Sequence, residues 1–122
     1  MAKTLAIVFG AMFVLVGLLG FVPNPLVGPE GALFETDLMH NLVHLLFGVI
    51  LLVVAFKNEA ASALWLMILG IVYLVLAVLG FLMIPEEGEL LGIVHMNHAD
   101  HWLHVGLAVL LIGSSFLAKK QD

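Results

Sequence analysis

Residues 60–84 read AASALWLMILGIVYLVLAVLGFLMI, an apolar run that contains no charged residue. A helix needs about 20 such residues to cross the roughly 30 Å hydrocarbon core of a bilayer. Residues 4–22, 38–56 and 98–118 form three further apolar segments of similar length. The sequence therefore predicts an all-α integral membrane protein built as a four-helix bundle.

The composition of the whole chain supports this class. Of its 122 residues, 63% are hydrophobic and only 11% are charged, against about 45–50% and about 25% in soluble domains. The apolar segments leave no room for a soluble domain, so residues 1–122 are expected to form a single transmembrane domain in contact with the lipid bilayer. The formal net charge of −5 disfavours nucleic acid as a partner. Because the chain has no cysteine, thiolate metal sites and thiol catalysis are excluded.

The few positive charges predict the orientation in the membrane. Cytoplasmic ends of membrane spans carry an excess of lysine and arginine. Four crossings place every lysine on one side: Lys3, Lys57, Lys119 and Lys120. The acidic residues of the two longer loops and of the following helix start fall on the other side: Glu30, Glu35, Asp37, Glu86, Glu87, Glu89 and Asp100. We therefore expect a multi-pass protein with both termini in the cytoplasm.

The two halves of the chain, residues 1–60 and 61–120, resemble each other. Aligned without a gap, they match at glycine, proline and histidine as well as at aliphatic positions: Gly10 with Gly70, Gly20-Phe21 with Gly80-Phe81, Pro25 with Pro85, Gly28 with Gly88, and His44 with His104. The first and third helices run in the same direction. The pattern thus predicts two similar helical hairpins related by a pseudo-twofold axis along the membrane normal, a parallel repeat.

Asp37 and Asn97 occupy equivalent positions in the two halves, and each precedes an apolar run, which is typical of helix N-caps. His44 and His104 lie seven residues further on, about 10 Å below the outer helix ends at about 1.5 Å per residue. Ionisable residues at this depth nearly always face the bundle interior or a cavity. We expect the apolar pieces 32–34 and 90–94 to fold back over this end of the bundle.

Histidine is concentrated at the same end, where residues 95–104 read HMNHADHWLH. Imidazole suits zinc and copper. The spacing brings potential ligands onto one face of each helix, and the candidate metal ligands are His40, His44, His98, His101 and His104. Asn41 and Asp100 are candidates for the surrounding hydrogen bonds, since Asp100 precedes His104 by one helical turn.

Three alternatives to a metal site remain open. The histidines can serve as structural hydrogen-bonding groups. His44 and His104 can ligate a haem or a chlorin, for which the small residues Gly48 and Ala108 would leave room. The protein can also be an accessory or scaffold subunit of a larger membrane complex, or a homo-oligomer, that uses its glycine strips for packing. No catalytic motif such as H-E-x-x-H or a nucleophile elbow is present, so an enzyme is not expected.

Four stretches together resemble a known family: Gly20-Phe21, Leu33-Phe34, HNLVHLLFG at 40–48 and DHWLH at 100–104. They resemble the bacterial membrane proteins grouped as domain of unknown function 4383. The resemblance implies a four-helix protein of the bacterial inner (plasma) membrane with a paired signature at His40, Asn41, His44, Asp100 and His104. That family's second motif more usually reads Asp-Asn-x-Leu-His, from which His101 departs. The resemblance implies no activity.

Overall fold

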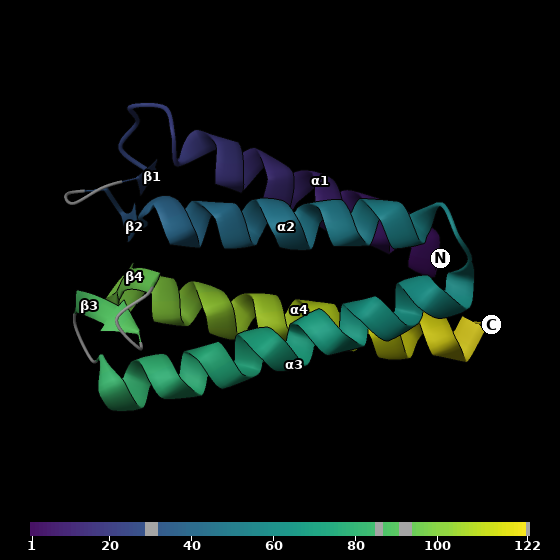
Figure 1. Ribbon diagram of the computed structural model, residues 1–122. Coiled ribbons are helices and arrows are strands. Elements are labelled where there is room, and N and C mark those ends of the chain that lie inside the picture. The colour runs from purple at the N-terminus through teal and green to yellow at the C-terminus, as the bar shows by residue number, and fades with distance from the viewer. Residues whose placement is uncertain (29–31, 85–86, 91–93, 122) are drawn as a thin grey trace.

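A computed structural model describes residues 1–28, 32–84, 87–90 and 94–121 (Figure 1). Within this part of the chain four helices are long and apolar enough to cross a membrane. They are α1 (Ala2–Leu19), α2 (Leu38–Ala55), α3 (Glu59–Met83) and α4 (His98–Gln121). The described part also contains four short strands, β1 (Val27–Gly28), β2 (Phe34–Glu35), β3 (Glu87–Leu90) and β4 (Val94–Asn97). The predicted four-helix membrane protein is confirmed.

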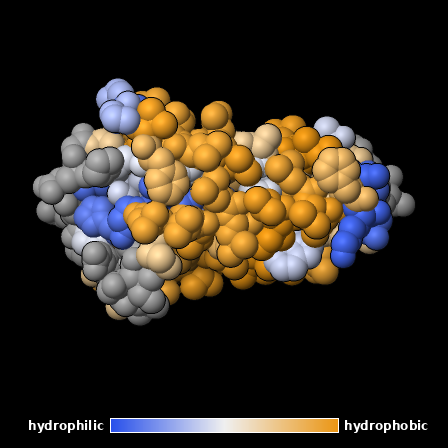
Figure 2. Space-filling view, turned by 45° about the horizontal axis from the view of Figure 1, so that its top comes forward, coloured by the Kyte–Doolittle hydropathy of each residue, from blue (hydrophilic) through white to orange (hydrophobic). Residues whose placement is uncertain are grey.

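The helices form two hairpins, because α1 packs closely along α2 and α3 packs closely along α4. Figure 1 shows that both termini and the turn between α2 and α3 lie at one end, whereas the strands lie at the other. Hydrophobic side chains cover the middle of the surface in Figure 2, and hydrophilic residues appear at the two ends. This distribution matches a lipid-facing belt between two aqueous boundaries.

Side-chain caps explain where the helices begin. Asp37 is extended and its carboxylate accepts a hydrogen bond from the backbone N–H of His40 at 2.9 Å. Asn58 caps α3 in the same way, through the N–H of Ala61 at 2.7 Å. At the start of α4 the side chains of Asn97 and Asp100 each accept from the other's backbone N–H, at 3.0 and 2.8 Å. The predicted caps at Asp37 and Asn97 are confirmed.

The first helix ends earlier than the hydrophobicity predicts. Residues 4–22 were expected to be helical, but α1 ends at Leu19. The Asn24 side chain donates to the carbonyls of Leu19 and Val22 at 2.8 and 2.7 Å. These bonds satisfy backbone acceptors that a continuing helix would use itself, so the chain turns here although it remains apolar.

The strands form two small sheets over the end of the bundle. β1 pairs in parallel with β2, and β3 pairs in antiparallel with β4. The prediction that the second loop folds back over the bundle concerned residues 90–94, of which 91–93 lie outside the described residues. Residues 94–97 form β4, which contacts α2, β2 and α4. This strand places His95 and Met96 above the helices.

Glycines mark where the helices of each hairpin come closest. A Cβ on Gly10 would lie 2.9 Å from Leu52, and one on Gly70 would lie 2.5 Å from Ile112. Gly20 likewise lies against the side chain of Asn41, and Gly80 lies against the ring of His101. These two contacts of the first hairpin thus have their counterparts 60 residues later in the second.

Residues at equivalent positions of the two halves also meet between the hairpins. The Phe13 and Tyr73 ring centroids are 5.5 Å apart, and those of His44 and His104 are 6.5 Å apart. Glu35 Oε1 lies 3.0 Å from Nε2 of His95, a residue 60 positions later. Pairs of this kind are expected along a pseudo-twofold axis. The internal repeat stays a prediction that these contacts support.

Candidate metal centre

Three histidines come together between the two hairpins. His40 and His44 lie one turn apart on α2, and their rings stack at 4.9 Å between centroids. The ring of His104 on α4 lies 5.7 Å from that of His40. All three residues are buried, with exposed fractions of 3% or less. One ring nitrogen of each lies within 4.8 Å of the other two, a geometry in which the three could hold a metal ion.

The histidines line a cavity of about 180 Å³. Its remaining lining residues come from α2, α3 and β4: Val43, Phe47, Val72, Tyr73, Leu76 and Met96. The cavity therefore lies where the first hairpin meets α3, and it includes a residue of the strand over the bundle. Among the residues that the structure describes, none of those lining the cavity carries a carboxylate.

Hydrogen bonds to the other ring nitrogens orient two of the imidazoles. His40 Nδ1 lies 2.7 Å from the carbonyl oxygen of His95. A carbonyl only accepts, so Nδ1 carries the proton and Nε2 of a neutral His40 keeps its lone pair. His44 Nδ1 lies 3.2 Å from the Tyr73 hydroxyl, which is able to accept in the same way. Metal-binding histidines are characteristically fixed by such bonds from the second nitrogen.

His104 has unused hydrogen-bonding capacity. Its Nδ1 is buried and has no hydrogen-bond partner among the described residues. A buried polar atom without a partner costs about 1–3 kcal/mol. This atom belongs to one of the three clustered imidazoles, so the cluster contains a buried polar atom that no described residue satisfies.

Haem fits this site poorly. Cavities for ligands of drug size are about 300–1,000 Å³, whereas this cavity measures about 180 Å³. The ring of His40 also stacks directly on that of His44, the expected haem ligand. The space suits a single ion with its ligands better than a haem or a chlorin.

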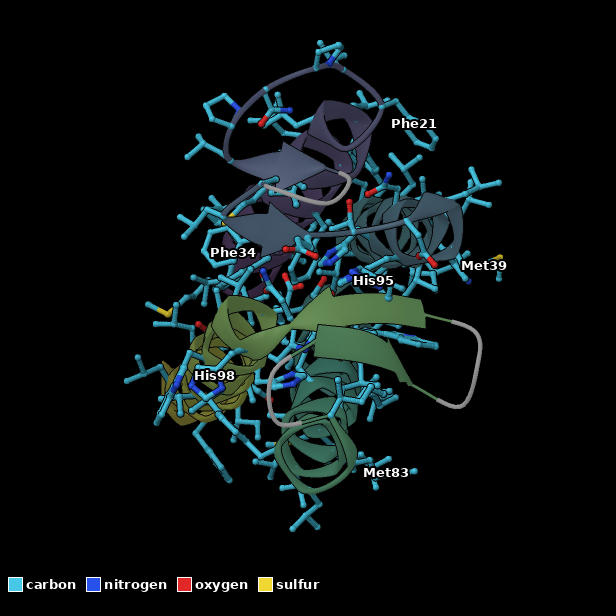
Figure 3. All side chains as sticks on the ribbon, turned by 90° about the vertical axis from the view of Figure 1, so that its left-hand side faces the viewer. Phe21, Phe34, Met39, Met83, His95 and His98 are labelled. Carbon is cyan, nitrogen blue, oxygen red and sulfur yellow. The ribbon has the colours of Figure 1, made fainter. Side chains whose placement is uncertain are left out.

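The other predicted ligands lie elsewhere. His101 packs against Phe81, at 5.3 Å between ring centroids, and its Nε2 donates to the carbonyl oxygen of Ile84. His98 is exposed and accepts a hydrogen bond from Trp102 Nε1 at 3.0 Å. Figure 3 shows His98 at the outer edge of α4, whereas His95 lies centrally between the hairpins. The structure thus does not bring His98 or His101 into the cluster.

The two candidate supporting residues serve the helices rather than the imidazoles. Asp100 was expected to accept from the ring of His104, but its carboxylate accepts from the backbone of Asn97 in the α4 cap. Asn41 lies with its side chain against Gly20 of α1. Both are almost fully buried.

Tyr73 and Met96 line the cavity together with the histidines, although the sequence patterns did not single them out. Tyr73 is the only tyrosine of the chain and lies in the middle of the longest apolar run. A buried tyrosine hydroxyl usually has a hydrogen-bond partner, so a tyrosine in the middle of an apolar segment indicates a polar contact there. Met96 gives no such signal, because methionine is common in apolar segments and its place depends on the course of β4.

These features define a class: a multi-pass membrane protein of two packed helical hairpins with a buried histidine cluster near one end. The model of the family described as domain of unknown function (DUF4383) matches residues 3–117, and the chain belongs to this family. The resemblance predicted from the four motifs is thereby confirmed. No curated protein and no solved structure matches the chain.

Proposed function

We propose that the protein binds a transition metal ion through His40, His44 and His104. The observation that carries this proposal is the approach of three ring nitrogens to within 4.8 Å of one another in a buried cavity. A tetrahedral ion with ligands at about 2.0–2.1 Å holds them about 3.4 Å apart. Closing the cluster around an ion therefore requires a movement of about 1 Å, which side-chain rotations supply.

Binding without catalysis is the role that this site supports. The cavity is small, and the described residues that line it include no general base besides the ligands themselves. The glycines of the close helix contacts, among them Gly10, Gly20, Gly70 and Gly80, are occupied by packing within the chain. They consequently lend no support to the alternative of an accessory subunit that docks through these strips.

Metal analysis of purified protein tests the proposal. After incubation with zinc or copper salts and removal of unbound metal, the protein in detergent is expected to retain about one equivalent of ion per chain. The double variant His44→Ala/His104→Ala should retain none. His98→Ala is the matched control, because it removes an exposed imidazole of α4 outside the cluster. Failure of the wild-type protein to retain metal, or equal loss in the control, contradicts the proposal.

We further infer that the protein lies in the bacterial inner membrane with both termini in the cytoplasm, so that the histidine cluster faces the outer side. Lys3 and Lys57 belong to the end that holds the termini, while Glu35 and Asp37 belong to the opposite end (Figure 1). The excess of positive charge on the cytoplasmic side supports this orientation.

The cysteine-free sequence makes the orientation simple to test. A membrane-impermeant thiol reagent applied to intact cells is expected to label Leu33→Cys, an exposed site beside β2, but not Lys57→Cys, an exposed site in the α2–α3 turn. Labelling of both variants after lysis shows that each thiol is reactive. The reverse pattern in intact cells means that the orientation is inverted.

A further inference from the structure

We propose that the centre selects monovalent copper, Cu(I), over zinc and other divalent ions, with the thioether of Met96 as a fourth ligand. This inference rests on the proposed function and specifies its metal. It follows from the chemistry of the donor atoms, from the lack of negative charge among the described lining residues, and from the way β4 holds Met96.

The described side chains that line the cavity offer only neutral donors. Besides the three imidazoles, they supply one phenol from Tyr73 and one thioether from Met96; the rest are hydrocarbon. Thioether sulfur is a soft ligand that selects Cu(I), and imidazole binds copper as well as zinc. Hard ions such as Ca²⁺ and Mg²⁺ prefer carboxylate oxygen, which the described lining residues do not provide.

Three carboxylates among the described side chains near this end of the bundle have other partners. Asp37 accepts from the backbone N–H groups of His40 and His95, at 2.9 and 3.2 Å. Glu35 pairs with the ring of His95, and Asp100 accepts from the backbone of Asn97. None of these three acidic residues lines the cavity.

Because the described lining residues include no anionic ligand, the charge of the ion decides the energetic cost of its entry. Moving an ion from water into a medium of low dielectric costs an energy that grows with the square of its charge. A divalent ion in this cavity therefore costs about four times as much as a monovalent one. The penalty applies to this site because its three imidazoles are buried between helices that are apolar enough to span a membrane.

The backbone of β4 fixes Met96 beside the ligands. Met96 is 1% exposed. The preceding residue, His95, receives the His40 Nδ1–H at its carbonyl and donates its own N–H to Asp37. The following residue, Asn97, caps the helix that carries His104. The backbone on both sides of Met96 is thus tied to the two helices that supply the imidazoles, and the Met96 side chain packs against Ile84 and lines the same cavity.

Tyr73 acts as a positioning residue. Its hydroxyl contacts Nδ1 of His44 and, as the acceptor, leaves His44 Nε2 with its lone pair for the ion. All ligands of Cu(I) are then neutral, so binding releases no proton. A divalent ion that recruited the phenolate would release one proton per ion. Proton release therefore distinguishes the two modes of binding.

Competition titrations test the selectivity. Detergent-solubilised protein is titrated under anaerobic reducing conditions with Cu(I) against bicinchoninate, and separately with Zn²⁺ against a zinc indicator. The variants are Met96→Leu, which removes the sulfur but keeps an apolar side chain of similar size, and Met39→Leu, a control at an exposed methionine of α2. X-ray absorption of the Cu(I)-loaded wild-type protein reports whether sulfur is bound to copper.

The expected wild-type result is tighter binding of Cu(I) than of Zn²⁺, with one sulfur bound to the metal and no proton released. Loss of an outer partner alone weakens metal binding by about 10–100-fold. Met96→Leu should therefore weaken Cu(I) binding by at least about tenfold and leave Zn²⁺ binding unchanged, and Met39→Leu should alter neither.

Three results overturn the inference: equal or tighter binding of Zn²⁺, unchanged Cu(I) affinity in Met96→Leu, or no sulfur in the absorption spectrum. In each case the metal site of the proposed function stands. If Met96→Leu does not fold, the wild-type spectrum decides alone. If the wild-type protein binds neither ion, both proposals fall together.

Discussion

Replacing Gly80 by alanine tests the close packing of α3 against α4. A Cβ at this position would overlap the ring of His101, which is completely buried. The ring is also held by the hydrogen bond from its Nε2 to the carbonyl of Ile84. Since interiors are densely packed, the ring cannot turn away without displacing its neighbours.

The magnitude follows from three contributions. Overpacking costs about 1–3 kcal/mol, and loss of the hydrogen bond adds about 0.5–1.5 kcal/mol. Alanine offsets about 1 kcal/mol of this, because glycine is the poorer helix former. We therefore expect the free energy of unfolding of Gly80→Ala to fall by about 0.5–3.5 kcal/mol.

The assay is unfolding of the detergent-solubilised protein with SDS, followed by the circular dichroism of its helices. Gly106→Ala is the matched control, because Gly106 is an exposed residue of α4 whose added Cβ meets nothing within 4 Å. It should stabilise the protein by about 0.5–1 kcal/mol. If Gly80→Ala is as stable as Gly106→Ala, the described contact between Gly80 and His101 is wrong.

The same unfolding assay checks three further substitutions. Gly48→Ala should destabilise at least as much as Gly80→Ala, because its Cβ would lie 2.8 Å from backbone atoms of Gly10 and Val14, which move less easily than a side chain; unchanged stability would argue against this approach of α1 and α2. Replacing an ordinary N-cap, as in Asn58→Ala, costs about 0.5–2 kcal/mol of stability. Asp37→Ala should cost more, because Asp37 also accepts a hydrogen bond from the backbone of His95. A smaller loss in Asp37→Ala than in Asn58→Ala would contradict the link to β4. Ser115→Ala removes a buried hydrogen bond to the Ala63 carbonyl and should cost about 0.5–1.5 kcal/mol, whereas Ser114→Ala should have little effect; equal losses would refute the contact.

The sequence was sufficient to predict the membrane spans because their signals are local. Apolar length sets the number of helices, and the short polar side chains of Asp37 and Asn97 set two helix starts. The end of α1 was predicted three residues too late, since hydrophobicity does not reveal that Asn24 captures the Leu19 carbonyl. Pairing of β3 with β4 was not predicted, because the segments are short and lack an alternating pattern.

The candidate site was predictable in part for a similar reason. Depth below the helix caps singled out His44 and His104, and helical spacing added His40. Spacing alone assigned His101 to the same cluster, although its ring packs against Gly80 and Phe81. Which side of α4 faces the first hairpin depends on the rotation of that helix, and this rotation is set by tertiary packing. The position of Met96 depends on the same tertiary packing, because β4, which carries this residue, contacts α2 and α4.

The contact between Glu35 and His95 has a consequence for how such a protein could have arisen. In a symmetric dimer of a single hairpin, a residue on the twofold axis meets its own copy, so a glutamate there faces a glutamate. Like charges in contact repel. Joining two hairpins in one chain removes this constraint, because each axial position then mutates independently in the two halves. The complementary pair of Glu35 with His95, and the pairing of Phe13 with Tyr73, are combinations that identical subunits could not produce. If the chain arose by duplication of one hairpin, the duplication allowed the two halves to carry different residues at the axis, as Glu35 and His95 do.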